Sequence, residues 1–358
     1  MNSLVIGRNR TAVEQLKVFC DSVVLAFDDS FANQRNFPEF ANYTIVYSRT
    51  NISSLKGVIP RVKEIIKWQK QFDIDIIYTN TKWDMLAAKI ASLFIKKFVI
   101  LISTSHNSYA WQNNSSVRMM SRLINATTHL YLPLASFVYD KLCAYGIRKE
   151  KLLLLPNIIE TNSWEYKTSY KSNGIFKVAY VAYVYPAKRQ DFILEVLNVL
   201  GREYQIIVDC YGDVDGYPEY VSTLKEKISS YGLEDSFHLL GRVDNAFLRT
   251  KLKDYDAYFC PSNLEMSPVN LIEAQAAGLP ILSANVGGVP DIIKDGETGL
   301  LYESGNVQHA VGKLVELYSN EELRERLGTS AYKYVTKSYT IQLSGLQLKN
   351  KIESVMNR

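Results

Sequence analysis

Residues 261–305 read PSNLEMSPVNLIEAQAAGLPILSANVGGVPDIIKDGETGLLYESG, and this stretch follows directly on the apolar run YDAYFC. Ser267 and Pro268 predict the start of a helix, with Ser267 as the N-cap and Pro268 in the first helical position. We expect the helix to run to about Ala277, because Gly278 is suited to close it. A strand, a loop and a helix in this order are typical of one repeat of a parallel α/β sheet.

The start of this helix is a candidate anion site. The amides of Val269, Asn270 and Leu271 have no partner within the helix and lie at the positive end of its dipole. Such a site suits a diphosphate. Glu265 in the preceding loop and Glu273 inside the helix add two carboxylates, which accept hydrogen bonds from hydroxyl groups. One carboxylate can face a sugar while the other reaches the ribose of the same nucleotide.

Outside this stretch, short apolar runs rich in β-branched residues alternate with helical patterns. In the first half, strands are predicted at SLVIG, SVVLAF, YTIVYS, IDIIYTN, KFVILIS and THLYLP. In the second half, they are predicted at FKVAYVAY, YQIIVDCYG, SFHLLGRV, YDAYFCPS, LPILSANV and TGLLY. This alternation is typical of a doubly wound α/β sheet, and 358 residues suffice for two such domains.

The polar residues 160–174 show no clear period and are predicted to link the two domains. We therefore expect a first Rossmann-like domain at residues 1–159 and a second at residues 175–341. A last helix, at about 342–358, packs back on the first domain or caps the second. Neither half carries a GxGxxG fingerprint, which argues against an NAD-dependent dehydrogenase.

Composition and cysteine spacing favour a cytoplasmic globular protein. Apolar residues make up 47% and charged residues 22% of the chain. The four cysteines form no CxxC pair, which argues against a zinc cluster or a disulfide scaffold and favours a reducing compartment. We find no secretory signal pattern, and no apolar run approaches the roughly 20 residues needed to span a bilayer.

The two halves differ in charge. Residues 1–155 hold 20 Lys and Arg against 11 Asp and Glu, a formal charge of +9, whereas residues 156–358 hold 21 against 26, a charge of −5. A basic first half favours an anionic partner such as a membrane surface or a phosphate-bearing substrate, unless the distribution is chance. Residues 60–72, PRVKEIIKWQKQF, predict either a helix resting on anionic lipid or an ordinary sheet-covering helix. Nothing in the sequence resembles a nucleic-acid-binding module.

Glu265, seven intervening residues and Glu273 match the E-x7-E motif of retaining GT-B glycosyltransferases. The residues around them resemble glycosyltransferase family 4, whose members often read E-G-x-x-x-x-x-x-E-A-M-A-x-G-x-P-V-V-x-S. The likeness continues through GGVP at residues 287–290 and DGETG at residues 295–299. The resemblance implies a GT-B fold, with two Rossmann-like domains facing each other across a deep cleft.

Further likeness lies upstream. Residues 178–200 resemble the strand, loop and helix that open the family's donor domain, which implies that Lys188 contacts the donor's β-phosphate and stabilises the leaving diphosphate. The run HLLGRV resembles the loop that receives the nucleobase, which implies that Gly241 and Arg242 lie near the base or ribose.

One departure from the family pattern concerns the diphosphate. Where members commonly read V-G-R-L-x-x-x-K-G, this chain has Ala182 and Tyr183 in place of Gly-Arg. Arg189, directly after the motif lysine, is the candidate replacement for the missing arginine.

In the first half, the resemblance points to His106, in the sequence ISTSHNS, as a residue that faces the donor sugar from the opposite domain. The implied catalytic residues are therefore Glu265, His106 and Lys188. The donor-binding set comprises Lys188, Arg189, Gly241, Arg242, Glu265, Ser267, Val269, Asn270, Leu271 and Glu273.

The implied reaction transfers a hexose from a UDP- or GDP-type sugar to a hydroxyl of a glycan or lipid-linked glycan, with retention, in surface-polysaccharide synthesis. Neither a metal nor a cofactor is expected, since Asp213 and Asp215 only imitate a DxD motif outside the expected diphosphate cradle. Two alternatives remain open. One is a weakly catalytic or non-catalytic partner subunit that binds nucleotide sugar, which the departure at Ala182 and Tyr183 supports, and the other is a GT-B nucleotide-sugar epimerase.

Overall fold

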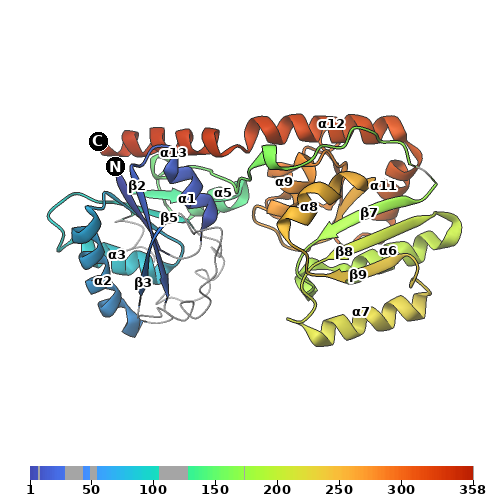
Figure 1. Ribbon diagram of the computed structural model, residues 1–358, viewed down its shortest axis with the longest axis horizontal. Helices are drawn as coiled ribbons and strands as arrows, with labels where there is room; N and C mark the ends of the chain where they lie inside the picture. The colour runs from blue at the N-terminus through green and yellow to red at the C-terminus, as the bar shows by residue number, and fades with distance from the viewer. Residues whose placement is uncertain (7–8, 29–42, 49–54, 105–127, 173, 358) are drawn as a thin grey trace. The chain divides into compact units, whose positions relative to one another are not determined.

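The computed structural model describes residues 1–6, 9–28, 43–48, 55–104, 128–172 and 174–357. The chain divides into two compact units, each with its own six-stranded parallel sheet (Figure 1). Unit 1 comprises Met1–Pro156 and Ile341–Arg358, and unit 2 comprises Asn157–Thr340. All twelve strands in the described part of the chain overlap the predicted runs, which confirms the α/β class. None of the helices in these described ranges is long and apolar enough to cross a bilayer.

The sheet of unit 1 has the strand order β3-β2-β1-β4-β5-β6. Its strands are β1 (Asn2–Ile6), β2 (Ser22–Asp28), β3 (Thr44–Ser48), β4 (Ile76–Thr79), β5 (Ile100–Thr104) and β6 (Leu130–Leu132). Its helices are α1 (Arg10–Lys17), η3 (Leu55–Gly57), α2 (Val58–Phe72), α3 (Lys82–Ser92), α5 (Ser136–Ala144), η5 (Lys149–Lys151) and α13 (Ile341–Met356).

Successive residues of β1 pack in two different cores, because side chains of a strand alternate between the faces of the sheet. Leu4 and Ile6 pack with α2 and α3, whereas Val5 packs with α1 and α13. Burial on both faces explains why the strands are continuous apolar runs in the sequence.

The C-terminal helix α13 packs on α1 in unit 1, the first of the two placements expected for it. Leu348 is fully buried in the core that α1 covers. Gln15 Nε2 of α1 donates a hydrogen bond to Ser344 Oγ at 2.7 Å. Gly345 permits the close approach of the two helices, since a Cβ atom there would lie 2.5 Å from the Val18 side chain.

Helix α2 covers the sheet with its apolar side. Val62, Ile65 and Trp68 are buried in the core, so they cannot contact lipid. Even Arg61 is only 1% exposed and faces carboxylates inside the unit. Of the two alternatives for residues 60–72, the sheet-covering helix is therefore correct. The outer face of α2 exposes Lys63, Lys67 and Lys70.

The sheet of unit 2 has the strand order β12-β11-β10-β7-β8-β9. Its strands are β7 (Phe176–Val181), β8 (Ile206–Tyr211), β9 (Phe237–Gly241), β10 (Ala257–Cys260), β11 (Ile281–Ala284) and β12 (Leu300–Tyr302). Its helices are η6 (Thr161–Ser163), η7 (Pro186–Lys188), α6 (Gln190–Leu200), η8 (Gly201–Glu203), α7 (Pro218–Tyr231), α8 (Asn245–Lys251), η9 (Leu252–Asp254), α9 (Val269–Ala276), α10 (Val289–Ile292), α11 (Val307–Ser319) and α12 (Glu321–Ser338).

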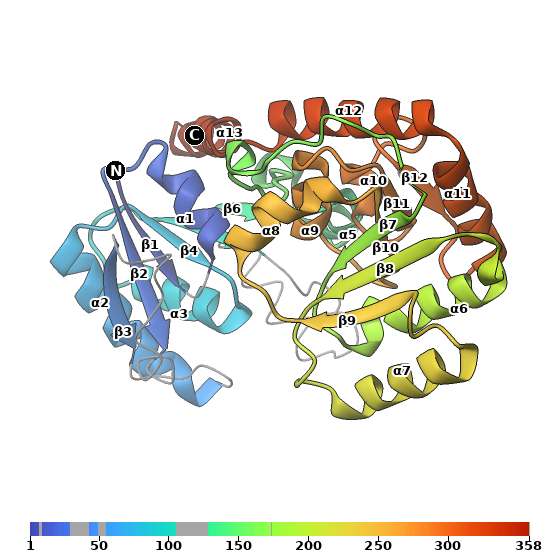
Figure 2. The same ribbon diagram turned by 45° about the vertical axis from the view of Figure 1, so that its right-hand side comes forward.

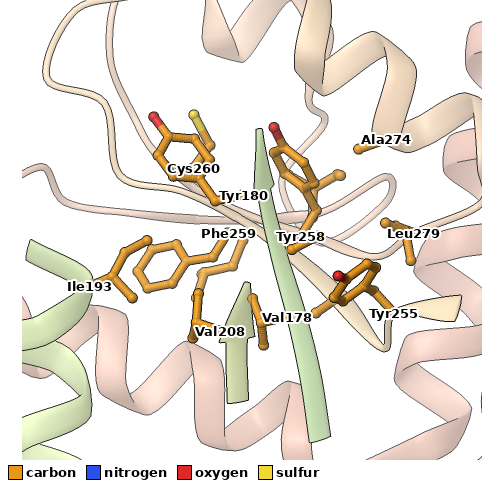
Figure 3. Packing of buried hydrophobic residues seen from close by; sticks show 14 of the residues in the cluster. Val178, Tyr180, Ile193, Val208, Tyr255, Tyr258, Phe259, Cys260, Ala274 and Leu279 are labelled. Carbon is orange, nitrogen blue, oxygen red and sulfur yellow. The ribbon is translucent and has the colours of Figure 1, made fainter. Parts of the chain in front are cut away.

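Helices cover both faces of this second sheet, with α6 and α7 on one side and α8 and α9 on the other (Figure 2). Neighbouring residues of β10 pack against the helices on opposite faces of the sheet. Phe259 lies beside Ile193 of α6, whereas Tyr258 points toward Ala274 of α9 (Figure 3). Tyr258 and Phe259 thus contribute to the packing of α9 and α6, respectively.

The segment predicted as a linker packs against unit 2. Trp164 and Tyr170 are 8% and 5% exposed, and Tyr170 Oη donates to Gly278 O at 2.7 Å. The carbonyl of Tyr170 accepts hydrogen bonds from the Arg324 guanidinium of α12 at 2.8 and 3.1 Å. Trp164 and Tyr170 thus anchor this segment to unit 2, although most residues of 160–174 are polar.

The close contact between α1 and α13 predicts opposite effects for two helical glycines. Gly345→Ala should lower the free energy of unfolding by about 1–3 kcal/mol, because its Cβ overlaps Val18. Gly312→Ala on α11, where a Cβ meets nothing within 4 Å, should raise it by about 0.5–1 kcal/mol. Chemical denaturation of both variants tests this, and equal stabilisation by both would rule out the close contact.

Candidate functional site

The strand order of unit 2 places a topological switch point at the carboxyl ends of β7 and β10. These two strands are neighbours, but the chain leaves β7 toward β8 on one side and leaves β10 toward β11 on the other. In open α/β sheets, ligands bind at such a switch point. The loops that follow β7 and β10 carry Lys188 and Glu265, respectively.

Lys188 and Glu265 form the central ion pair of the candidate site. Lys188 ends the short helix η7, and its Nζ donates to Glu265 Oε1 at 2.5 Å. The two side chains are 17% and 8% exposed, so the pair is largely removed from water. The pair joins two residues that are 77 positions apart in sequence.

The environment of Lys188 keeps it charged. Burial lowers the pKa of its ammonium group, but the carboxylate of Glu265 more than offsets this by its charge and its hydrogen bond, so the Lys188 pKa is raised above its ordinary value of 10.5. The hydroxyl of Tyr185 contributes a smaller effect in the same direction. Lys188 therefore presents a full positive charge at neutral pH.

Buried polar contacts hold the two loops together. Tyr180 of β7 donates from its hydroxyl to Lys188 O at 3.0 Å, and that hydroxyl also lies 2.9 Å from Ser262 Oγ after β10. The backbone of Asn263 donates to Ala187 O at 3.1 Å. These contacts fix the spacing between the lysine and the glutamate.

A glycine pair positions Glu265 from its other side. The amide of Gly288 donates to Glu265 O at 2.9 Å. Gly287 has a φ of +50°, and a Cβ atom there would lie 2.0 Å from Glu265 O. Only glycine fits both the left-handed backbone and the contact.

The start of α9 differs from its prediction by one residue. The N-cap is Pro268 and the helix begins at Val269, so Ser267 is not the cap. Ser267 Oγ instead accepts from the backbone of Asn157 at 2.9 Å, and Asn157 Nδ2 donates to Ser267 O at 2.8 Å. The Ser267 hydroxyl therefore bonds Asn157, 110 positions away in sequence, and does not cap the helix.

The amides at the start of α9 are only partly available. Leu271 N donates to Pro268 O at 3.2 Å, so the expectation of a free amide at Leu271 is wrong. The amides of Val269 and Asn270 donate to no other group among the described residues. Asn270 Nδ2 donates to Val181 O at 2.9 Å and so binds the helix to the end of β7.

Glu273 lies one turn further along α9. Burial first, and charges that include Glu273, raise the pKa of Tyr258 well above its ordinary value. Glu273 follows Asn270 by three residues, so the two side chains lie on the same side of α9.

Arg189 points to a different partner. It has a left-handed backbone with φ of 54°, and its Nε lies 3.2 Å from both carboxylate oxygens of Asp191. Tyr220 Oη donates to the same carboxylate at 2.7 Å. The charge of Arg189 is therefore balanced locally. Tyr183, at the position of the family's arginine, is 66% exposed.

Gly241 ends β9 and Arg242 follows it, at the same edge of the sheet and two strands from β7. Gly241 has a φ of +73° and accepts a hydrogen bond from Gly212 N at 2.9 Å. Gly212 in turn approaches Ala182, whose carbonyl oxygen would lie 1.8 Å from a Cβ at position 212. Arg242 is exposed.

His106 lies outside the described residues. Within unit 2, the structure brings together Lys188 and Glu265, and it pairs Arg189 with Asp191. Sequence reasoning missed Tyr180 and Ser262, because a tyrosine in an apolar strand and a serine in a loop carry no local signal of their long-range contact.

Profiles of two related protein families match the chain. One described as Glycosyl transferases group 1 matches residues 163–334, and one described as Glycosyltransferase Family 4 matches residues 14–163. An amylovoran biosynthesis glycosyltransferase of Erwinia amylovora is 28% identical over 207 residues, or 55% of this chain and 49% of that protein. An uncharacterized 41.2 kDa protein in the cps region of Klebsiella pneumoniae is 26% identical over 301 residues, or 78% and 77%. The matched part thus spans about half the length of the amylovoran protein.

Solved structures share the fold over the whole chain. A glycosyltransferase from Rickettsia africae has a TM-score of 0.86 at 16% identity, covering 99% of this chain and 98% of that one. The Anabaena protein HepE, solved in complex with UDP and glucose, has a TM-score of 0.81 at 18% identity, covering 99% and 100%. The two parallel α/β units and these matches define a protein of the GT-B class. The chain belongs to glycosyltransferase family 4, because the two family profiles together extend over both units.

The contact between Gly287 and Glu265 predicts a difference between two glycines with positive φ. Gly296→Ala, at φ of +73° with nothing within 4 Å, should cost about 1–2 kcal/mol for the backbone alone. Gly287→Ala should cost more, since its Cβ also displaces the Glu265 carbonyl. Chemical denaturation compares the two, and equal costs would contradict the proposed role of the glycine pair.

The ion pair predicts a pH effect. Because the folded-state pKa of Lys188 is raised, the pair stabilises fully below the ordinary value of 10.5, and this contribution is lost as the pH rises through the folded-state value. Glu265→Gln leaves burial as the main influence, so the Lys188 pKa should fall. The pH profile of Lys188 acylation, read by mass spectrometry, measures it. The exposed Glu297→Gln is the control, and an unchanged profile in Glu265→Gln would contradict the pairing.

Proposed function

We propose that unit 2 binds a nucleoside diphosphate sugar at the carboxyl ends of β7 and β10 and that the protein transfers its hexose to a hydroxyl of a glycan or lipid-linked glycan. The observation that carries this proposal is the buried Lys188–Glu265 pair beside the first turn of α9. A buried cation, a buried carboxylate and free helix amides are the groups that a diphosphate sugar requires.

Lys188 and the amides of Val269 and Asn270 would carry the negative charge of the leaving diphosphate. The ammonium group is largely desolvated and fixed by two loops, so its interaction with a phosphate is stronger than in water. We propose that these groups suffice without a metal. The two carboxylates would bind hydroxyls, with Glu265 on the sugar and Glu273 on the ribose. By resemblance alone, His106 is proposed as a further sugar-binding residue.

Three further parts of the proposal rest on resemblance. The Anabaena neighbour solved with UDP and glucose supports a UDP-type donor, with GDP as the alternative. The E-x7-E motif supports retention at the anomeric carbon. The polysaccharide relatives and the basic first half support a lipid-linked or surface-glycan acceptor handled in the cytoplasm at an anionic membrane.

A second candidate function is a nucleotide-sugar-binding subunit with little or no catalytic activity. Tyr183 replaces the family's arginine, and Arg189 is already paired with Asp191. If Arg189 keeps that partner when donor is bound, only one side chain, Lys188, supplies positive charge to the diphosphate. Turnover of the bound donor separates this candidate from the active transferase.

The donor assignment predicts a nucleotide-specific stabilisation. Thermal shifts are measured with UDP, GDP, ADP, CMP and their common sugars on the wild type, Lys188→Gln, Glu273→Ala and the control Glu234→Ala. One nucleotide at 100 times its Kd should stabilise the wild type and the control by about 2.7 kcal/mol. The two site variants should respond less, because each has lost a donor contact.

No response to any nucleotide, or an equal response in Glu273→Ala, would overturn the donor site. With the stabilising donor and a glycan acceptor, NMR of the product then reports the anomeric configuration. An inverted product would contradict retention, and binding without turnover would leave the partner-subunit function.

A further inference from the structure

The loop between α3 and β5 exposes three large apolar side chains on unit 1. Leu93 is 71% exposed, Phe94 69% and Phe98 61%. Single exposed apolar residues are ordinary on protein surfaces, but three within six positions form a patch that indicates an interaction site. We refer to residues 93–98 as the 93–98 loop.

The structure holds this loop in place. Lys97 Nζ lies 2.9 Å from Asp73 Oδ1 and 2.6 Å from Asp75 Oδ1, which anchors the loop to the end of α2. Phe94 N donates to Ala91 O at 2.9 Å in the turn that ends α3. The apolar side chains therefore project from an anchored turn.

Positive charge surrounds the patch. Lys96 is exposed within the loop. The ring of Phe98 packs edge-on against His129 at 5.1 Å between centroids. Lys89 lies in the last turn of α3, directly before the loop. Burial first, and then the charges of Lys89 and Lys151, lower the pKa of His129. The charge of Lys97 is already neutralised by its two aspartates.

The position of the loop separates it from the sheet edge where substrates are expected. The 93–98 loop precedes β5 and so lies at the amino-terminal edge of the sheet of unit 1. Ligands of open α/β sheets bind at the carboxyl edge. Substrate binding at the carboxyl edge therefore does not account for this patch.

We propose that the 93–98 loop docks on an anionic lipid bilayer, with Leu93, Phe94 and Phe98 entering the interface and Lys89 and Lys96 contacting lipid phosphates. Apolar side chains gain by leaving water, and each lysine near an anionic surface is attracted to it. Protein interfaces, by contrast, are depleted in lysine, which favours lipid over a protein partner. The formal charge of +9 on residues 1–155 adds attraction at longer range.

This inference goes beyond the proposed sugar transfer and does not depend on the donor site. A small apolar patch or a few lysines alone would bind a membrane weakly, and the two together give reversible attachment.

The test is sedimentation of the full-length protein with vesicles of phosphatidylcholine alone or mixed equally with phosphatidylglycerol. We expect binding to the mixed vesicles only, weakening with added salt. Leu93→Ser with Phe94→Ser should reduce affinity about tenfold or more through lost apolar burial. Lys96→Gln should reduce it about fivefold through the loss of one charge.

Two matched controls should bind as the wild type does. Ile59→Ser removes an apolar side chain that is 68% exposed at the other end of unit 1, and Lys225→Gln removes an exposed lysine of unit 2. Unchanged nucleotide thermal shifts in every variant would show that the donor site is intact. Failure of the wild type to bind mixed vesicles, or equal binding by the Leu93→Ser and Phe94→Ser double variant, would overturn the proposal. Loss of self-association in that variant without any vesicle binding would assign the loop to a contact between copies and overturn it as well.

Discussion

The candidate site depends on the ion pair between Lys188 and Glu265. Neither side chain is stable alone in that position, because a buried charge without a partner is strongly unfavourable. The surrounding contacts hold the two residues of this pair in position. Tyr180 and Ser262 join the two loops, and Gly287 allows the Glu265 backbone to sit against the next turn of the chain. A bound diphosphate would then meet a cation whose position is already set.

Close backbone contacts at glycines recur in unit 2. Gly212 adjoins Ala182, Gly287 adjoins Glu265, and Gly328 adjoins Gly278 at the end of α9. Each is a place where a side chain would push two segments of the chain apart. The contact of Gly287 with Glu265 explains the first glycine of the GGVP motif. A side chain at position 287 would displace the loop that carries Glu265.

The two units carry different kinds of surface chemistry. Unit 2 keeps its central charges paired and desolvated at the carboxyl ends of its strands. Unit 1 carries apolar and basic side chains on the 93–98 loop, which precedes β5 at the amino-terminal edge of its sheet. A division in which one unit binds a soluble nucleotide and the other attaches to a lipid surface matches the charge difference between the two halves of the sequence.

The sequence by itself determined the α/β class, the twelve strands, and the loop-and-helix segment with Glu265 and Glu273, because local periodicity and turn residues act over a few positions. Tertiary structure decided which distant residues meet. Lys188 finds Glu265 because β7 and β10 are neighbours in the sheet, and Ser267 bonds Asn157 where its local sequence predicts a cap. Arg189 pairs with Asp191, and Phe94 is exposed whereas Trp68 is buried. Strand order and packing set these outcomes, and neither is encoded in any short stretch of the chain.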